Sequence, residues 1–197
     1  MLKELTAVPD AVLPLAEFRD HLRLGTGFSD TGAEDAALLA YLRAALAAIE
    51  GRTAKALIAR DFTLVLTAWR WGDLQTLPIA PVRAVAALRV IDRAGGESLA
   101  DAAAWRLIED LARPRIEARG AALPAIPAGG RVEIDFTAGF GPVWADLPVD
   151  LAQAVFLLAA QYYEFRHDGA GEGAALPFGV SALIERWRTV RVLGGRG

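Results

Sequence analysis

Hydrophobic residues recur at helical spacing in the first part of the chain. A short apolar stripe after Pro14 predicts a helix over about 15–24. Four residues then follow at steps of four, four and three, on one helical face: Leu38, Leu42, Leu46 and Ile49. They predict a long helix over about 32–50. Gly51 is the expected terminator, although the pattern can be read as resuming up to Ile58.

From about residue 62 the spacing changes to the alternation of β-strands. The clearest strand is 131–136, in which Val132, Ile134 and Phe136 form an apolar face opposite Arg131, Glu133 and Asp135. Other strands are predicted over 62–66, with alternation continuing to Trp69 and Trp71, and over 82–91, 105–109 and 115–118.

Helical spacing returns at Val149 and continues to about Arg166. This helix is apolar nearly all round, so it must be covered by the β-layer, the first long helix or a neighbouring subunit. A complete core within one subunit and self-association are both open, and Phe156 and Tyr163 are the candidates for a subunit interface. Ser181 is predicted to cap a last short helix.

Helices on both sides of a β-section indicate an α+β fold. We expect a mainly helical core, formed by an N-terminal helix pair and a long C-terminal helix, with a central antiparallel β-section. The absence of repeats and long linkers predicts a single domain over 1–197. Its expected parts are helices over about 15–58, a β-section over about 62–137, helices over about 148–190 and a loose tail over 191–197.

Composition excludes several classes of protein. The 197 residues are 54% hydrophobic and 23% charged, which excludes overall disorder. A net charge of -3 is unlike a polybasic nucleic-acid binder, and the lack of cysteine excludes disulfides and thiolate metal sites. The most apolar stretch, Leu151–Ala160, is too short for a bilayer, so no membrane partner is expected.

Residues suited to catalysis are few. Glu133 and Asp135 share a strand face, but their alternation with Arg131 favours a solvated surface over a carboxylate pair. Ser181 lacks the second glycine of a nucleophile elbow, and His21 and His167 fit helix surfaces. The glycines at 139–141 predict a turn, because no Lys-Ser/Thr follows them. We therefore expect no catalytic residues, no metal and no cofactor.

A basic strip marks the last predicted helix and tail. Arg186, Arg188, Arg191 and Arg196 accompany Glu185, with Trp187 between them. Arginine with an exposed aromatic residue is typical of protein interfaces. A weak nucleic-acid contact and an ordinary solvated helix end are the alternatives.

Six segments, in this order, resemble a known family over about 12–192. They read LPLAEFRDHLRL from Leu13, the helix 35–50, LPIAPV from Leu77, RVEIDFTAGFG from Arg131, LPVDLAQAV from Leu147 with Tyr162–Arg166, and PFGVSALIERWR from Pro177. The sequence resembles the head–tail connector (adaptor) proteins of long-tailed bacteriophages, prophages and gene transfer agents. Phe140 and Trp187 stand where that family usually has tyrosine.

The resemblance implies a structural, non-enzymatic subunit of a ring, commonly a dodecamer. The ring would lie beneath the portal protein, extend the DNA channel without sequence-specific contact, and dock stopper or tail-terminator neck proteins. Because the family's C-terminal segment tends to reach the portal, the implied portal contacts are Arg186, Trp187, Arg188 and Arg191. The expected location is the virion neck, after synthesis in the bacterial cytoplasm.

Two other functions are weighed against this one. A small hydrolase would use Glu133 and Asp135, or His167. A soluble regulator would bind nucleic acid through its basic tail, with an affinity that falls steeply with salt.

Overall fold

The computed structural model describes residues 1–24, 33–166 and 176–188. Within these ranges the chain divides into two compact units. Residues 1–8 and 54–140 form one, called here the sheet unit. Residues 9–53 and 141–188 form the other, called the helical unit. The single domain expected from the sequence remains a prediction.

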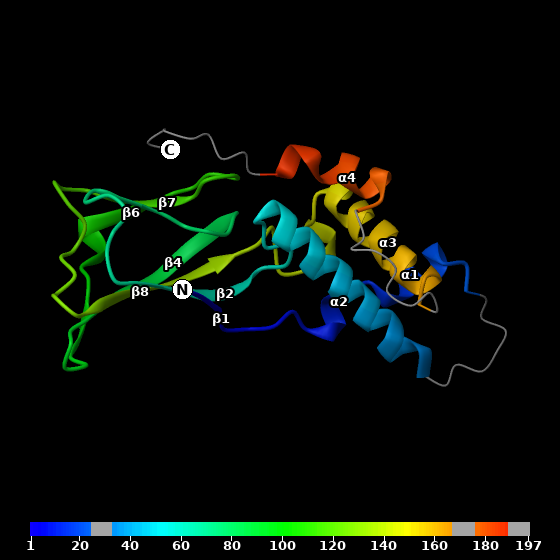
Figure 1. The fold of residues 1–197 in the computed structure, drawn as a ribbon, viewed down its shortest axis with the longest axis horizontal. Coiled ribbons are helices and arrows are strands. Elements are labelled where there is room, and N and C mark those ends of the chain that lie inside the picture. The colour runs from blue at the N-terminus through cyan, green and yellow to red at the C-terminus, as the bar shows by residue number, and fades with distance from the viewer. Residues whose placement is uncertain (25–32, 167–175, 189–197) are drawn as a thin grey trace. The chain divides into compact units, whose positions relative to one another are not determined.

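The sheet unit contains two antiparallel sheets (Figure 1). The five-stranded sheet has the order β1(Leu2–Glu4), β2(Arg60–Leu66), β8(Arg131–Ala138), β4(Val82–Ile91), β5(Glu97–Leu99). The three-stranded sheet has the order β3(Leu74–Thr76), β7(Arg115–Ala118), β6(Trp105–Ile108), and a 3-10 turn, η2(Ala102–Ala104), precedes β6.

The core of the sheet unit lies on the apolar face of β8. Val132, Ile134 and Phe136 are buried, as their alternation predicts. Phe136 pairs across the ladder with Phe62, and their rings stack with centroids 5.6 Å apart. Ile116 from the three-stranded sheet belongs to the same apolar cluster, so the two sheets share one core.

The helical unit consists of packed helices and short 3-10 turns. In chain order these are η1(Asp10–Val12), α1(Leu15–His21), α2(Ala33–Thr53), η3(Trp144–Asp146), α3(Val149–Glu164), α4(Phe178–Ile184) and η4(Glu185–Trp187). The predicted stripe of α2 is buried, and α3 packs against both α2 and α4. Among the described residues, no helix is long and apolar enough to span a bilayer.

The α+β class is confirmed, with helices on both sides of the β-section in sequence. The description as a mainly helical core is matched only in part, because the two sheets have a large apolar core of their own. Strands β1, β3 and β5 were not predicted. Each has three residues and no buried apolar face for an alternating pattern to reveal.

Three local predictions are wrong. Strand β2 ends at Leu66, so Trp69 and Trp71 lie in the irregular segment between β2 and β3 and not in a strand. Helix α2 continues through Gly51 to Thr53, whose hydroxyl donates to the carbonyl of Ile49. Ser181 is not a cap: α4 begins at Phe178, and the Ser181 N–H already donates to the carbonyl of Pro177, an ordinary helical bond.

Candidate interaction site

The candidate site lies where η4 meets the start of α3. Helix α4 runs beside α3, and η4 follows it directly (Figure 1). Pro148 and Pro177 have extended backbone angles immediately before α3 and α4, so both helices start just after a proline. This arrangement places Glu185–Trp187 next to the first turn of α3.

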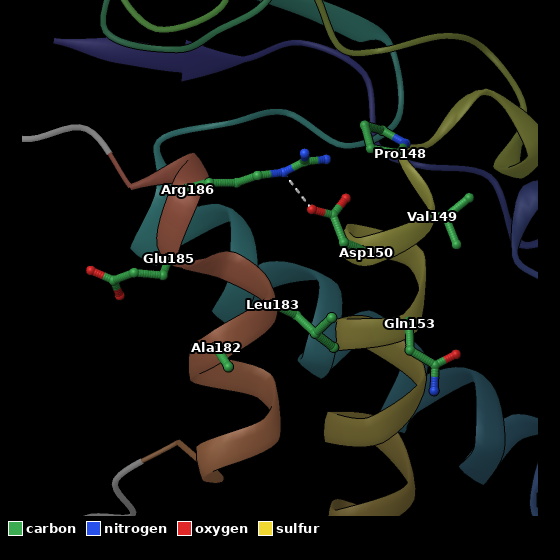
Figure 2. A pocket seen from close by; sticks show the side chains of 8 residues that line it. All are labelled: Pro148, Val149, Asp150, Gln153, Ala182, Leu183, Glu185 and Arg186. Carbon is green, nitrogen blue, oxygen red and sulfur yellow. Dashed lines mark ion pairs between the residues drawn. The ribbon is translucent and has the colours of Figure 1, made fainter.

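Asp150 connects the two segments. Its Oδ2 accepts a hydrogen bond from Trp187 Nε1 at 2.7 Å. The same oxygen forms an ion pair with Arg186 Nε, also at 2.7 Å (Figure 2). Its Oδ1 accepts from the backbone N–H of Leu151 at 3.0 Å. The Arg186 guanidinium lies 4.7 Å from the centre of the Trp187 ring, a cation–π distance.

This environment keeps Asp150 ionised. Burial alone would raise its pKa, but the hydrogen bonds from Trp187 and Arg186, together with the charge of Arg186, lower the pKa below its usual value. The carboxylate also lies in the first turn of α3, where the helix dipole favours negative charge. Asp150 therefore acts as a fixed anion that holds η4 to α3.

An open groove runs along this junction. Its lining is apolar at Pro148, Val149, Ala182 and Leu183, and polar at Asp150, Gln153, Glu185 and Arg186 (Figure 2). The Val149 side chain is 85% exposed. A hollow with apolar walls and a charged rim suits a protein contact better than a small-molecule pocket.

The structure brings together three of the four residues implied as portal contacts. The side chains of Arg186 and Arg188 are 69% and 58% exposed, while Trp187 is half-buried against Asp150. Arg188 also pairs with Glu185 at 3.1 Å. Arg191 and Arg196 lie outside the described residues, as does His167. The sequence reasoning missed Asp150. Its position as an acidic residue in the first turn of a helix is the one feature of the sequence that could have pointed to it.

Phe156 and Tyr163, the predicted subunit-interface residues, are half-buried and engage neighbours within the helical unit. Phe156 lies among aromatic rings, with centroids 5.8 Å from Phe18, 5.5 Å from His21 and 5.4 Å from Trp144. Tyr163 makes an edge contact with Tyr41 at 6.2 Å. Their role between subunits remains a prediction.

The carboxylates considered for hydrolysis are engaged in ion pairs. Arg89 contacts Asp135 at 2.6 Å and Glu133 at 3.6 Å, and Arg131 contacts Glu133 at 2.8 Å. Asp135 also accepts from the Thr63 hydroxyl at 2.6 Å. Both carboxylates are thus paired with arginine side chains, and Asp135 also with a hydroxyl, on their own sheet face. This pairing favours a charged strand surface over a catalytic carboxylate pair. Over the described ranges, no three metal-ligating side chains gather.

The glycine that follows β8, Gly139, allows two backbone segments to approach each other closely. Gly139 has a φ of +138°, and a Cβ there would lie 2.3 Å from the Cα of Ala59. The neighbouring Phe140 N–H donates to the carbonyl of Leu57 at 3.2 Å. Gly139 is thus required by a close approach of two backbone segments, and the predicted turn fits this geometry.

Three solved structures contain chains similar to this one over the full length of both. A chain in the neck of an empty gene transfer agent particle, computed with C6 symmetry, is 77% identical with a TM-score of 0.91. One in the virion of a native gene transfer agent particle is 77% identical with a TM-score of 0.88. One in the neck of a native particle, computed with C12 symmetry, is 72% identical with a TM-score of 0.86. No family model and no curated protein matches the sequence.

Proposed function

Because the chain belongs to a family of structural neck proteins of phage-like particles, we propose that it is the head–tail connector (adaptor) subunit of such a particle. One observation carries this proposal: 77% identity over the whole length to a chain in the neck of a gene transfer agent particle. The TM-score of 0.91 shows that the two chains also share their fold over that length.

In this role the chain forms a ring, and twelve copies is the expected number. The support is that its relatives lie in necks computed with C6 and C12 symmetry. The ring would surround packaged DNA without reading its sequence, consistent with a net charge of -3, which provides no strong phosphate-binding surface. Its place would be the virion neck, reached from the bacterial cytoplasm.

The proposed portal contact is the C-terminal surface of Arg186, Trp187 and Arg188, together with Arg191 of the undescribed tail. Two arginines on this surface are largely exposed, and Trp187 is held in place by Asp150. A pre-positioned aromatic residue flanked by arginines loses little side-chain entropy on binding. On the side of the ring that faces away from the portal, the partners would be stopper or tail-terminator proteins of the neck.

The proposal is tested by deleting the gene from a producing strain and imaging the released particles. We expect filled or empty heads without tails, and tails restored when the gene is supplied in trans. Normal tailed particles in the deletion strain would overturn the connector role. The same particles, purified from the wild-type strain, should contain this chain in their necks.

A further inference from the structure

The two most exposed large hydrophobic side chains of the described chain belong to one pair of helices. Phe178, at the start of α4, is 89% exposed, and Val149, at the start of α3, is 85% exposed. Large apolar side chains displayed this openly on a well-packed unit mark surfaces that another protein covers.

These two side chains lie at different ends of the pair. Asp150 of α3 bonds to Arg186 and Trp187, so Val149 lies beside the C-terminal end of α4 and η4. Phe178 precedes Arg186 by eight residues, about 12 Å along a helix. Gly179, next to Phe178, faces the Leu157 side chain in the middle of α3. The α3–α4 pair therefore presents an aromatic knob at one position and an apolar groove at another.

The chemistry of the two surfaces is complementary. Residues 176–184, around the knob, contain no charged residue. The groove offers Pro148, Val149 and Leu183 as apolar walls, with Asp150 and Arg186 already paired at its edge. An aromatic ring can enter such a groove without separating a charge from its partner, the arrangement found in the centres of protein interfaces.

A closed ring requires this kind of asymmetry. Neighbours related by a rotation of higher order than two contact each other through two different surfaces, so each subunit must carry both halves of the contact. Resting on the ring of the proposed function, we propose that Phe178 of one copy enters the groove formed by Pro148, Val149 and Leu183 of the next copy around the ring.

The test uses the cysteine-free sequence. A chain carrying Val149→Cys and Phe178→Cys is expressed in the producing strain in place of the natural one, and purified particles are oxidised and run on a denaturing, non-reducing gel. Because both positions are highly exposed in the single subunit, neither change removes a contact from the subunit's own core. We expect a ladder of covalent oligomers extending well beyond the dimer, because each subunit is linked on both sides. Co-expressed single variants should yield cross-linked dimers at most.

A matched control pairs Val149→Cys with Leu111→Cys, since Leu111 is also exposed, at 61%, but lies outside the proposed contact. This control should give no ladder. A double variant that is present in the necks but remains monomeric, or stops at a dimer, overturns the contact and leaves the connector role intact. Absence of the natural chain from purified necks would instead overturn the proposed function itself.

Discussion

At the scale of single residues, Asp150 determines how η4 is held. Replacing it by alanine removes the acceptor for the Trp187 indole and the partner of Arg186. Hydrogen bonds to a charged group contribute about 1.5–3 kcal/mol, and the exposure of Arg186 reduces its share. We expect Asp150→Ala to lower the free energy of unfolding by about 1–2 kcal/mol in chemical denaturation. The same change at exposed Glu109 should leave it within about 0.5 kcal/mol.

The pH dependence of this contribution has a defined sign. The pKa of Asp150 is lowered in the folded protein, so its stabilisation is complete above the ordinary aspartate pKa, about 3.9, and is lost as the pH falls through the lower folded value. The difference in unfolding free energy between wild type and Asp150→Asn should be constant from pH 7 to about pH 5 and shrink below about pH 4. A difference that disappears near pH 6 would contradict this assignment.

At the scale of elements, the residue that follows α2 has a strained backbone conformation, which a substitution can relieve. Ala54, which follows Thr53, has a φ of +54°, a conformation that costs a residue with a Cβ about 1 kcal/mol and costs glycine nothing comparable. Ala54→Gly should therefore raise the free energy of unfolding by about 1 kcal/mol. The same substitution at exposed Ala47, inside the helix, should lower it by about 1 kcal/mol. Denaturation of the two variants would show opposite shifts of the midpoint.

The backbone crossing after β8 predicts a larger effect. An alanine at Gly139 would combine an unfavourable φ with a Cβ only 2.3 Å from the backbone of Ala59. We expect Gly139→Ala to cost about 3 kcal/mol or more, or to prevent folding. Gly72 has open space around it, and Gly72→Ala should change stability by less than about 0.5 kcal/mol. Equal behaviour of the two variants in thermal unfolding would show that the close approach is absent.

The sequence predicts elements well where one face is buried. β8 and α2 were predicted because Val132, Ile134 and Leu42 repeat at the period of their element and are buried. β5 could not be predicted, because all three of its residues are exposed and β4 alone sets its register. Trp69 made the strand prediction too long: it continues the alternation, but it lies after the end of β2, and its indole donates to the carbonyl of Pro124. Such contacts depend on residues distant in the chain.

At the scale of the whole molecule, the sequence indicated a candidate surface but not the contacts that build it. Arg186 and Trp187 were identified from composition and resemblance, whereas Asp150, 37 residues before Trp187, becomes part of the site only through folding. The Phe178 knob was likewise hidden, because an aromatic residue at the start of a helix reads as core until its exposure is known. Whether apolar residues face inward or toward a partner is decided by tertiary packing, which periodicity does not report.

The proposed portal surface makes a final prediction about assembly. Arg188→Glu reverses a charge on a side chain that is 58% exposed and whose partner in the structure is Glu185. If this surface meets the portal, the variant should fold normally yet be depleted roughly tenfold or more in the necks of purified particles, the effect of about 1.4 kcal/mol or more. The matched control is Arg93→Glu, an equal change of net charge at an exposed turn of the sheet unit, which should be incorporated like wild type.

Quantitative mass spectrometry of particles from strains that express each variant measures how much of each variant is incorporated. Because the two variants carry the same net charge, equal depletion would point to a general electrostatic effect, and undiminished incorporation of Arg188→Glu would remove this surface from the portal contact.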